Sequence, residues 1–171
     1  MIHIASDKTQ SLYDSLREED IQPNAIDLRV DKVFRIIASR EFILEEDSKQ
    51  HHETIPEPLN RQGYYDLNDG HYEIIMEGKV KIADGEAGFI LPRSTLNRNG
   101  VFMTTGLYDS GYHGVMASVM HVNCGTFKFK PGTRVGQFLL FKAEALHQYD
   151  GDYGVTKKHD DKYHHLQEGW D

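Results

Sequence analysis

Short apolar stretches, broken at close intervals by glycine and proline, constrain the fold of this chain more than any other feature. Phe127 and Phe129 alternate with lysines, Pro131 and Gly132 follow, and an apolar run begins again at Val135. Alternation with a period of two gives a strand one apolar face, and Pro-Gly favours a tight turn. This pattern predicts two strands joined by a turn, with the second strand over residues 135–141.

The same signals recur through most of the chain. Apolar positions alternate over residues 72–76, after a turn predicted over 68–70, and again over 80–82. Repeated helical crossovers, which a parallel βαβ fold requires, are missing from the pattern. The sequence therefore predicts a mainly β single domain of the sandwich, barrel or jelly-roll kind.

The sequence also predicts the local structure of two further segments and the environment of the single cysteine. Leu12 and Leu16 lie four residues apart, which predicts a short helix over residues 10–17. The polar, proline-containing run over 45–61 predicts a surface loop. Cys124 is the single cysteine, which excludes an internal disulfide, and we expect it to be a small buried apolar residue.

The net charge and the short apolar runs argue against several classes of protein. Nineteen Lys and Arg against 27 Asp and Glu give a formal charge of -8, the wrong sign for coating polymeric nucleic acid. No apolar run approaches the roughly 18 residues of a membrane helix, and no leader is visible, so we expect a cytoplasmic protein without a membrane. A small anionic ligand stays possible, because a few local arginines and backbone N–H groups can hold phosphates.

One short stretch carries the donors that phosphate oxygens require. Arg93, Ser94 and Thr95 present a guanidinium and two hydroxyls together, and Arg98 adds a second guanidinium if the segment turns helically. The alternative is a capping turn at the start of a short helix. Both interpretations use the same exposed N–H groups, so they are compatible.

A glycine-framed stretch over residues 106–114 predicts a tight hairpin that a ligand can approach closely. Asp109 is placed to hydrogen-bond a sugar hydroxyl or to orient a water, and Tyr112 to pack on the flat face of a sugar. The alternative for Asp109 is a turn residue that stabilises its own backbone. His113 is the histidine expected to contact a ligand. The pairs at 51–52 and 164–165 lack the spacing of a zinc site and predict solvated surface.

Two more polar positions lie in apolar surroundings. Asp27 stands between Ile26 and Leu28, and a half-buried carboxylate needs a partner, which is either Arg29 or another arginine, or a bound metal. Gln137, near the start of the strand predicted over 135–141, is either a ligand-binding residue or a polar residue of an edge strand.

In order and spacing, four stretches resemble the motifs of the family that joins trimeric dUTPases and dCTP deaminases. They are residues 22–28 (QPNAIDL), 92–100 (PRSTLNRNG), 106–114 (GLYDSGYHG) and 132–138 (GTRVGQF). Residues 149–154 (YDGDYG) resemble the start of a fifth, C-terminal motif. The resemblance covers roughly residues 21–156.

The resemblance implies a distorted jelly-roll subunit with one or two short helices, assembled as a homotrimer with active sites at subunit interfaces. It implies a deoxynucleoside triphosphate bound with Mg²⁺, to which Asp27 is linked through water. It divides the chain into a β domain over residues 1–148 and a tail over 149–171 that closes over the site. The substrate-binding residues it implies are Arg93, Ser94, Thr95, Arg98, Tyr112, Gln137 and Tyr149, with Asp109 as the catalytic residue that positions water.

The reaction depends on one position. Family deaminases carry a glutamate in the strand after the hairpin, and the aligned residue here is Val119, which cannot exchange a proton. Hydrolysis of dUTP to dUMP and pyrophosphate needs only an oriented water and neutralised phosphates, so a dUTPase-like pyrophosphohydrolase is the leading interpretation. The alternatives are dCTP deamination, alone or combined with dUTP hydrolysis, and a trimer that binds a deoxynucleotide without catalysis.

Overall fold

The computed structural model describes residues 1–37, 41–46, 48–50 and 52–155. Strands dominate this part of the chain, and the two helical segments are short. Along the chain the elements are β1 (Leu12–Tyr13), the 3₁₀ turn η1 (Glu18–Asp20), β2 (Ile26–Ile36), β3 (Ile43–Leu44), β4 (Lys49–Gln50), β5 (Thr54–Pro56), β6 (Tyr65–Lys81), β7 (Glu86–Pro92), α1 (Ser94–Arg98), β8 (Val101–Thr104), β9 (His113–Phe129) and β10 (Arg134–Lys142).

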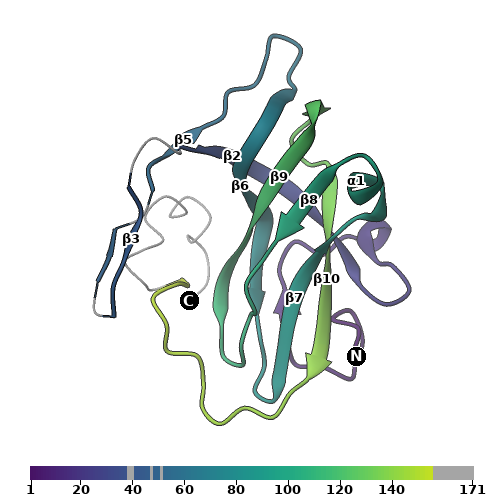
Figure 1. Cartoon of the computed structure of the whole chain (residues 1–171). Coiled ribbons are helices and arrows are strands. Elements are labelled where there is room, and N and C mark those ends of the chain that lie inside the picture. Colours follow the sequence, from purple (N-terminus) through teal and green to yellow (C-terminus); the bar gives the residue numbers. More distant parts are fainter. Residues whose placement is uncertain (38–40, 47, 51, 156–171) are drawn as a thin grey trace.

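One large sheet contains most of these strands, in the order β7-β10-β2-β6-β9-β8, with β1 added to β6 and β5 to β2 (Figure 1). Every pairing in the described part of the chain is antiparallel. The two ends of the sheet approach each other, because Gly88 of β7 bridges to Tyr108, just beyond β8. The result is a nearly closed, barrel-like sheet, and the predicted mainly β, jelly-roll-like fold is confirmed.

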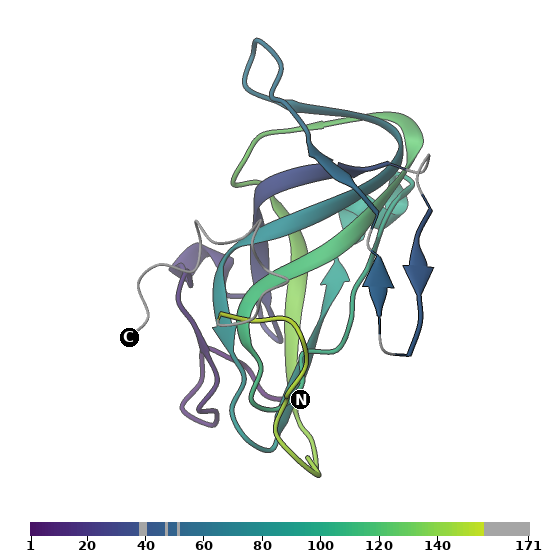
Figure 2. The ribbon, with the colours of Figure 1, turned by 90° about the vertical axis from the view of Figure 1, so that its left-hand side faces the viewer.

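Burial alternates along the strands as the sequence pattern predicts. In β10, Phe138 and Leu140 are buried in the main core, and their neighbour across β7, Ile90, is buried with them. The intervening residues face outward, so that Leu91 is 45% exposed. Figure 2 shows the long strands wrapping around this core in a curved layer, with the small β3–β4 sheet set apart from it.

The predicted turn at Pro131 and Gly132 is confirmed, since β9 ends at Phe129 and β10 begins at Arg134. The turn predicted over 68–70 is wrong, because the chain stays in β6 there and absorbs the disturbance as a shift of register against β9. A second shift lies between Ile75 and Lys79 and contains Gly78 at φ +72°. A side chain at Gly78 would collide with Asp14, so glycine is required for this bulge.

The helix predicted over residues 10–17 is also wrong. Leu12 and Tyr13 pair with β6, and the hydroxyls of Thr9 and Ser11 donate to Glu86. Two leucines four residues apart give too little apolar surface to hold a helix against these contacts with the sheet. The run over 45–61 is largely loop, as predicted, but also forms β4 and β5.

Cys124 is exposed, contrary to the expectation of burial. It lies where β9 passes the shift of register between Asn68 and Gly70, outside the packed part of the sheet. No helix in the described part of the chain has the length and apolar character needed to cross a membrane.

Candidate functional site

A short helix follows β7 and carries the predicted phosphate-binding turn. Arg93 keeps an extended backbone, with φ -63° and ψ 144°, and its N–H donates to the carbonyl of Val135 at 2.9 Å. Helix α1 begins at Ser94, and Leu96 fastens it to the core with 7% exposure. The helical turn expected at this point is confirmed. The side chains of Ser94, Thr95 and Arg98 are exposed to solvent.

Beside this turn, two guanidinium groups and one amide surround a buried carboxylate, and they come from β10 and from the residue that follows β7. The Asp27 side chain is fully buried, and its Oδ2 lies 3.5 Å from Arg93 Nε and 3.3 Å from Arg134 Nη1. Gln137 Nε2 donates to Asp27 Oδ1 at 3.1 Å. Both guanidiniums remain about one third exposed, at 35% for Arg93 and 34% for Arg134. We name these four residues the Asp27 cluster.

The register of the sheet explains how the cluster forms. Asp27 of β2 is the direct partner of Gln137 in β10, and Gln137 is also the partner of Leu91 in β7. Directly opposed residues in antiparallel strands share a face. Of the alternatives for Asp27, the ion pair with an arginine other than Arg29 is confirmed, because Arg29 instead binds Asp20 with three donor contacts.

Arg134 is the residue of the cluster that the predicted site lacks. Its Nη1 also donates to the carbonyl of Glu19 at 3.0 Å, and its own carbonyl accepts from Arg93 Nη1 at 3.4 Å. The available signal was its spacing of three residues from Gln137. In a regular strand that spacing puts the two side chains on opposite faces, and the register shift between Arg134 and Gly136 removes this restriction.

The hairpin segment over residues 106–114 follows β8 and leads into β9, and it has both exposed and buried side chains. Asp109 is exposed. Tyr112 is 7% exposed, and its hydroxyl donates to the carbonyl of Val115 at 2.7 Å. Burial raises the pKa of Tyr108 to about 12, and its hydroxyl donates to the carbonyl of Ala117 at 2.9 Å. The two tyrosines thus support the hairpin from within, while Asp109 faces solvent.

The described start of the tail runs alongside this hairpin. Tyr149 N–H donates to the carbonyl of Ser110 at 2.8 Å, and Val155 N–H to that of His113 at 2.9 Å. The ring of Tyr149 meets that of Tyr112 edge-on, with centroids 5.4 Å apart. A Cβ on Gly114 would lie 2.9 Å from Gly154 Cα, so this close approach needs glycine. The remainder of the predicted tail, residues 156–171, lies outside the described residues.

The Asp27 cluster and Asp109 do not meet within one chain. Tyr108 bridges to Gly88, and Ser110 Oγ donates to the carbonyl of Glu86, so Asp109 faces the beginning of β7. Arg93 follows the opposite end of the same strand (Figure 1). At about 3.3 Å per residue, the two side chains are separated by roughly 20 Å along β7.

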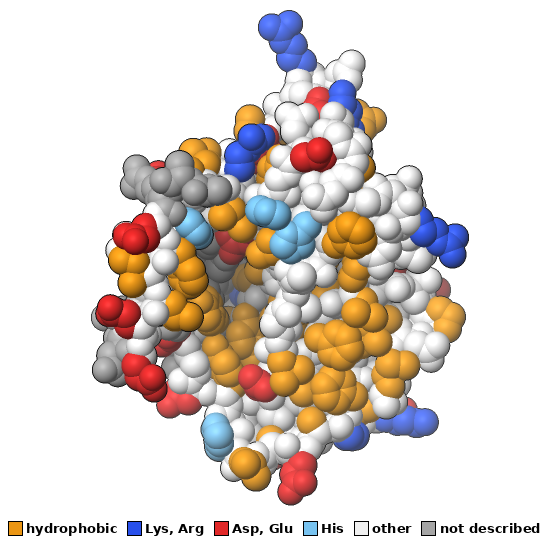
Figure 3. All heavy atoms as spheres, in the orientation of Figure 1, with side chains coloured by type: hydrophobic (Ala, Val, Ile, Leu, Met, Phe, Trp, Pro, Cys, Tyr) orange, Lys and Arg blue, Asp and Glu red, His pale blue; other side chains and the backbone are white. Residues whose placement is uncertain are grey.

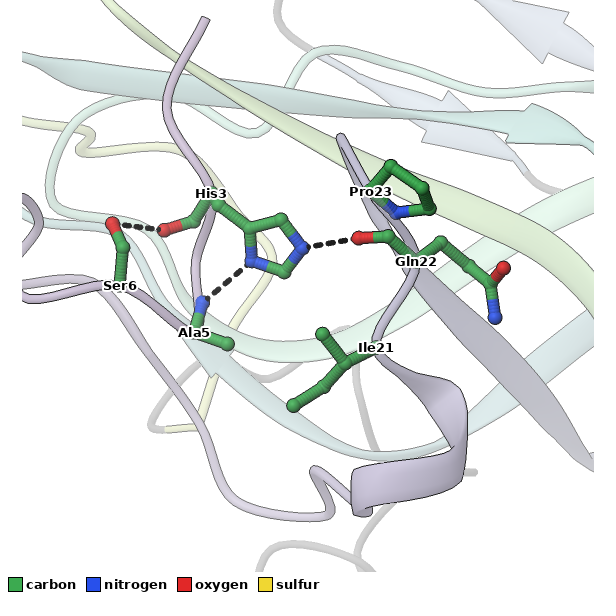
Figure 4. A pocket seen from close by; sticks show the side chains of 6 residues that line it. All are labelled: His3, Ala5, Ser6, Ile21, Gln22 and Pro23. Carbon is green, nitrogen blue, oxygen red and sulfur yellow. Dashed lines mark hydrogen bonds between the residues drawn. The ribbon is translucent and has the colours of Figure 1, made fainter.

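One groove in the described part of the chain lies at neither of these places. It has a volume of about 530 Å³, and Figure 4 shows His3 bonded across it to the carbonyl of Gln22 at 2.7 Å. None of the described residues that line it is Arg or Lys, the cations that a triphosphate requires. Its lining residues are His3, Ala5, Ser6, Ile21, Gln22 and Pro23.

Two other predicted positions have definite places. His113 begins β9 opposite Lys81, and burial, with Lys81 next, lowers its pKa. Val119, aligned with the deaminase glutamate, lies in the middle of β9, directly opposite Thr104 of β8 and Glu73 of β6.

Two solved structures share this nearly closed β fold, and they place it in the class of dUTPases and dCTP deaminases. The EIAV dUTPase superposes with a TM-score of 0.51 at 12% identity, and the match covers 83% of this chain and 94% of that one. The dCTP deaminase of Agrobacterium tumefaciens superposes with a TM-score of 0.58 at 17% identity, where this chain covers 45% of the deaminase and the match covers 80% of this chain.

Proteins found by sequence comparison share more identical residues with this chain than these two structures do. The probable deoxyuridine 5'-triphosphate nucleotidohydrolase of Methanopyrus kandleri is 33% identical over 147 residues, which is 85% of this chain and 94% of that protein. The protein of the same name from Methanothermobacter thermautotrophicus is 34% identical over 80% of this chain and 89% of its own length. Residues 2–143 match the dCTP deaminase-like family. The chain belongs to that family.

Proposed function

We propose that this protein hydrolyses dUTP to dUMP and pyrophosphate. The observation that carries the proposal is the Asp27 cluster, in which two partly exposed guanidiniums and an amide are held beside the exposed hydroxyls of α1. This donor set suits a triphosphate, and the relatives named above are called deoxyuridine 5'-triphosphate nucleotidohydrolases.

The phosphate chain binds at the turn after β7. Arg93 uses Nε toward Asp27, and a guanidinium has five N–H donors, so further donors remain for phosphate oxygens. Ser94 and Thr95 add hydroxyls, and Arg98, one helical turn further, adds a cation. Gln137 completes the set from β10.

Asp109 supplies the water. Its carboxylate accepts a hydrogen bond from a water molecule, whose oxygen then attacks the α-phosphorus in line with the bond to the bridging oxygen. As the new P–O bond forms, the water passes a proton to the Asp109 carboxylate, and dUMP results. The bond to the bridging oxygen breaks, and pyrophosphate leaves with the electron pair. The cations of the Asp27 cluster and α1 stabilise the charge on that leaving group.

When bound with the triphosphate, Mg²⁺ would neutralise part of the phosphate charge, and Asp27 is the residue that the resemblance links to it through water. Within the described residues, no group of three or more His, Cys, Asp or Glu could hold a metal ion. Asp27 is already surrounded by two guanidiniums and an amide, so its assignment to the metal stays a prediction of the resemblance. In this proposal its role is to orient Arg93 and Gln137.

The protein works as a homotrimer with shared sites. A water held by Asp109 must lie within about 3.5 Å of the phosphorus, whereas Arg93 is roughly 20 Å away along β7 in the same chain. Arg93, Ser94 and Gln137 of one subunit therefore face the hairpin that carries Asp109 and Tyr112 in the next.

An outward apolar face of the β7–β10 region is available for this assembly. Figure 3 shows hydrophobic side chains gathered there. Leu91 is 45% exposed, and Leu107, after β8, is 55% exposed. Phe89 and Phe141 contact each other on the same side, with ring centroids 6.0 Å apart. Such a face is typical of a surface covered in an assembly.

Mixing inactive variants tests the shared site. Asp109→Asn and Arg93→Ala subunits are each expected to lack turnover, but a mixed trimer contains some sites with both native residues. Activity should therefore return after verified subunit exchange. Two variants that stay inactive together, or a monomeric mass in solution, would remove the shared-site model.

Products separate the alternatives. Incubation with each deoxynucleoside triphosphate and Mg²⁺, followed by chromatography, should give dUMP and pyrophosphate from dUTP. Glu73 lies opposite Val119 and is the carboxylate that the strand register places nearest to it, so dCTP deamination that Glu73→Gln abolishes would establish the deaminase alternative. Binding without any product would establish the non-catalytic trimer.

The tail over residues 149–171 is proposed to extend the site formed by the β domain of residues 1–148. Its described start already lies on the hairpin that carries Asp109. Tyr149, packed on Tyr112, sets the direction in which the tail leaves the hairpin. A chain truncated after Gln148 should keep its fold and show a higher KM for dUTP.

A further inference from the structure

Two histidines meet on the outer face of the sheet, away from the Asp27 cluster and Asp109. His71 of β6 and His121 of β9 are direct partners in the register, and their Nδ1 atoms lie 2.9 Å apart. Their rings are nearly perpendicular, with centroids 5.0 Å apart and an interplanar angle of 73°. In Figure 3, histidine side chains lie against each other at the surface over β9. We infer that His71 and His121 form a binding site for a late first-row divalent transition-metal ion, such as Zn²⁺ or Co²⁺.

The separation of the two nitrogens matches that of neighbouring metal ligands. A metal to imidazole nitrogen bond is about 2.0–2.1 Å long, so two nitrogens 2.9 Å apart subtend roughly 90° at a metal bound to both. This is the angle between adjacent ligands of a six-coordinate or tetragonal ion. Each ring turns about its Cβ–Cγ bond to aim its lone pair at the ion. His71 is exposed, so water fills the remaining positions.

Thr104 prepares His121 for this role. Its Oγ1 lies 2.9 Å from His121 Nε2. A hydrogen bond from Nε2–H to this hydroxyl keeps the proton on Nε2 and leaves the lone pair on Nδ1, which is how an outer partner fixes the tautomer of a metal-bound histidine. The proton that now joins the two Nδ1 atoms then comes from His71, and it moves through solvent to His71 Nε2 when the metal binds. Both rings stay neutral.

The surroundings favour the neutral, metal-binding form. Burial lowers the pKa of His121, and the neighbouring His71 lowers it further. Phe102, the partner of His121 on β8, is apolar, and Val119 and Glu73 lie next along the same face. The backbone is fixed, because β9 is paired with β6 on one side and with β8 on the other. The two Cβ atoms are thus held in place before the ion arrives.

This site differs in chemistry from the Mg²⁺ of the proposed function. Mg²⁺ prefers oxygen ligands, whereas imidazole suits late transition metals. Its occupation also links β6 to β9 through side chains, so a metal that binds only the folded chain raises the thermal unfolding temperature. Binding of the ion to the two histidines requires neither the substrate nor turnover.

The test uses the full chain at pH 7.5 without nucleotide. We expect Zn²⁺, measured by calorimetry, to bind at least tenfold more weakly to His71→Asn and to His121→Asn than to the unsubstituted protein. His147→Asn, which changes an exposed histidine elsewhere, serves as the matched control and should bind as before. Thr104→Val should weaken binding less than loss of either imidazole, and Mg²⁺ should not compete.

Nuclear magnetic resonance locates the ion independently of any variant. One equivalent of Co²⁺ should broaden the imidazole resonances of His71 and His121 before those of the other histidines. Equal broadening of all histidines, or equal loss of Zn²⁺ affinity in His121→Asn and His147→Asn, would show adventitious binding only and overturn the inference.

Discussion

Replacing Asp27 by Asn removes the one negative charge around which the Asp27 cluster is built. The side chain keeps its size, and its oxygen can still accept from Gln137 Nε2. Arg93 and Arg134, however, lose the carboxylate that lies 3.5 Å and 3.3 Å from them, and they then face each other across a neutral amide. Breaking a buried ion pair on one side is costly, because the remaining charge has no partner.

The structure sets the size of the effect. At an effective dielectric constant of about 20, each of the two contacts is worth roughly 5 kcal/mol before desolvation is subtracted. Loss of one partner from a fully buried pair costs about 3–5 kcal/mol. Solvent screens the two guanidiniums, which are about one third exposed, so we expect a loss of roughly 2–3 kcal/mol. For a chain of this length that lowers the unfolding temperature by about 4–12 °C.

Thermal unfolding followed by circular dichroism, at a fixed protomer concentration, measures this loss. The matched control is Asp66→Asn, which removes a carboxylate that lies 3.0 Å from Lys128 in an exposed ion pair of the same sheet. Surface pairs contribute at most about 1 kcal/mol, so the control should change little. If Asp27→Asn and Asp66→Asn destabilise the protein equally, the reasoning about the buried cluster is refuted.

Three further substitutions have defined outcomes. Asp109→Asn should lower the kcat for dUTP by on the order of 10² to 10⁴ without lowering the unfolding temperature, because the side chain is exposed, and near-normal turnover would return Asp109 to a turn role. Arg93→Lys should weaken triphosphate binding in calorimetry far more than nucleoside binding, because an ammonium cannot match two oxygens at once, and equal losses would indicate a purely structural role. Burial raises the pKa of Glu86, but hydrogen bonds from Lys142, Ser11 and Thr9 outweigh it and lower this pKa below the ordinary 4.5. Its contribution to stability is therefore present above pH 4.5 and lost as the pH falls through the folded pKa, so Glu86→Gln should flatten that acid limb in unfolding scans, and an unchanged limb would contradict the assignment.

Local patterning predicted the elements whose two faces differ most. β10 has buried Phe138 and Leu140 on one face and partly exposed residues on the other, and the Pro131 turn before it is local. The structure of residues 10–17 is determined by distant contacts, because polar side chains there hydrogen-bond to residues about 70 positions away in the sequence. No local pattern carries that information, and the weak leucine spacing misled the prediction. The prediction that Cys124 is buried was wrong for a similar reason. The exposure of this residue depends on where the register between β6 and β9 shifts.

The candidate site was predicted by residue type but not by geometry. Arg93, Ser94 and Gln137 could be selected because their donors suit phosphate. That Gln137 and Arg134 share a partner depends on the register of β10 against β2 and on its bulge. Neither feature can be derived from spacing along one strand. The sequence left the partner of Asp27 open, and only the pairing of three strands decides it.

Burial of Asp27 couples the fold to the proposed ligand. A carboxylate with no exposure is tolerated at this place because two guanidiniums and an amide approach it from β10 and from the turn after β7. Each guanidinium has more donors than Asp27 can use and stays about one third exposed, so donors remain for a ligand that approaches from solvent. A hydrophobic residue at position 27 would avoid the cost of burying a charge, but it would leave both arginines unoriented. The same contact thus closes the start of β2 against β10 and prepares the cations that a triphosphate needs.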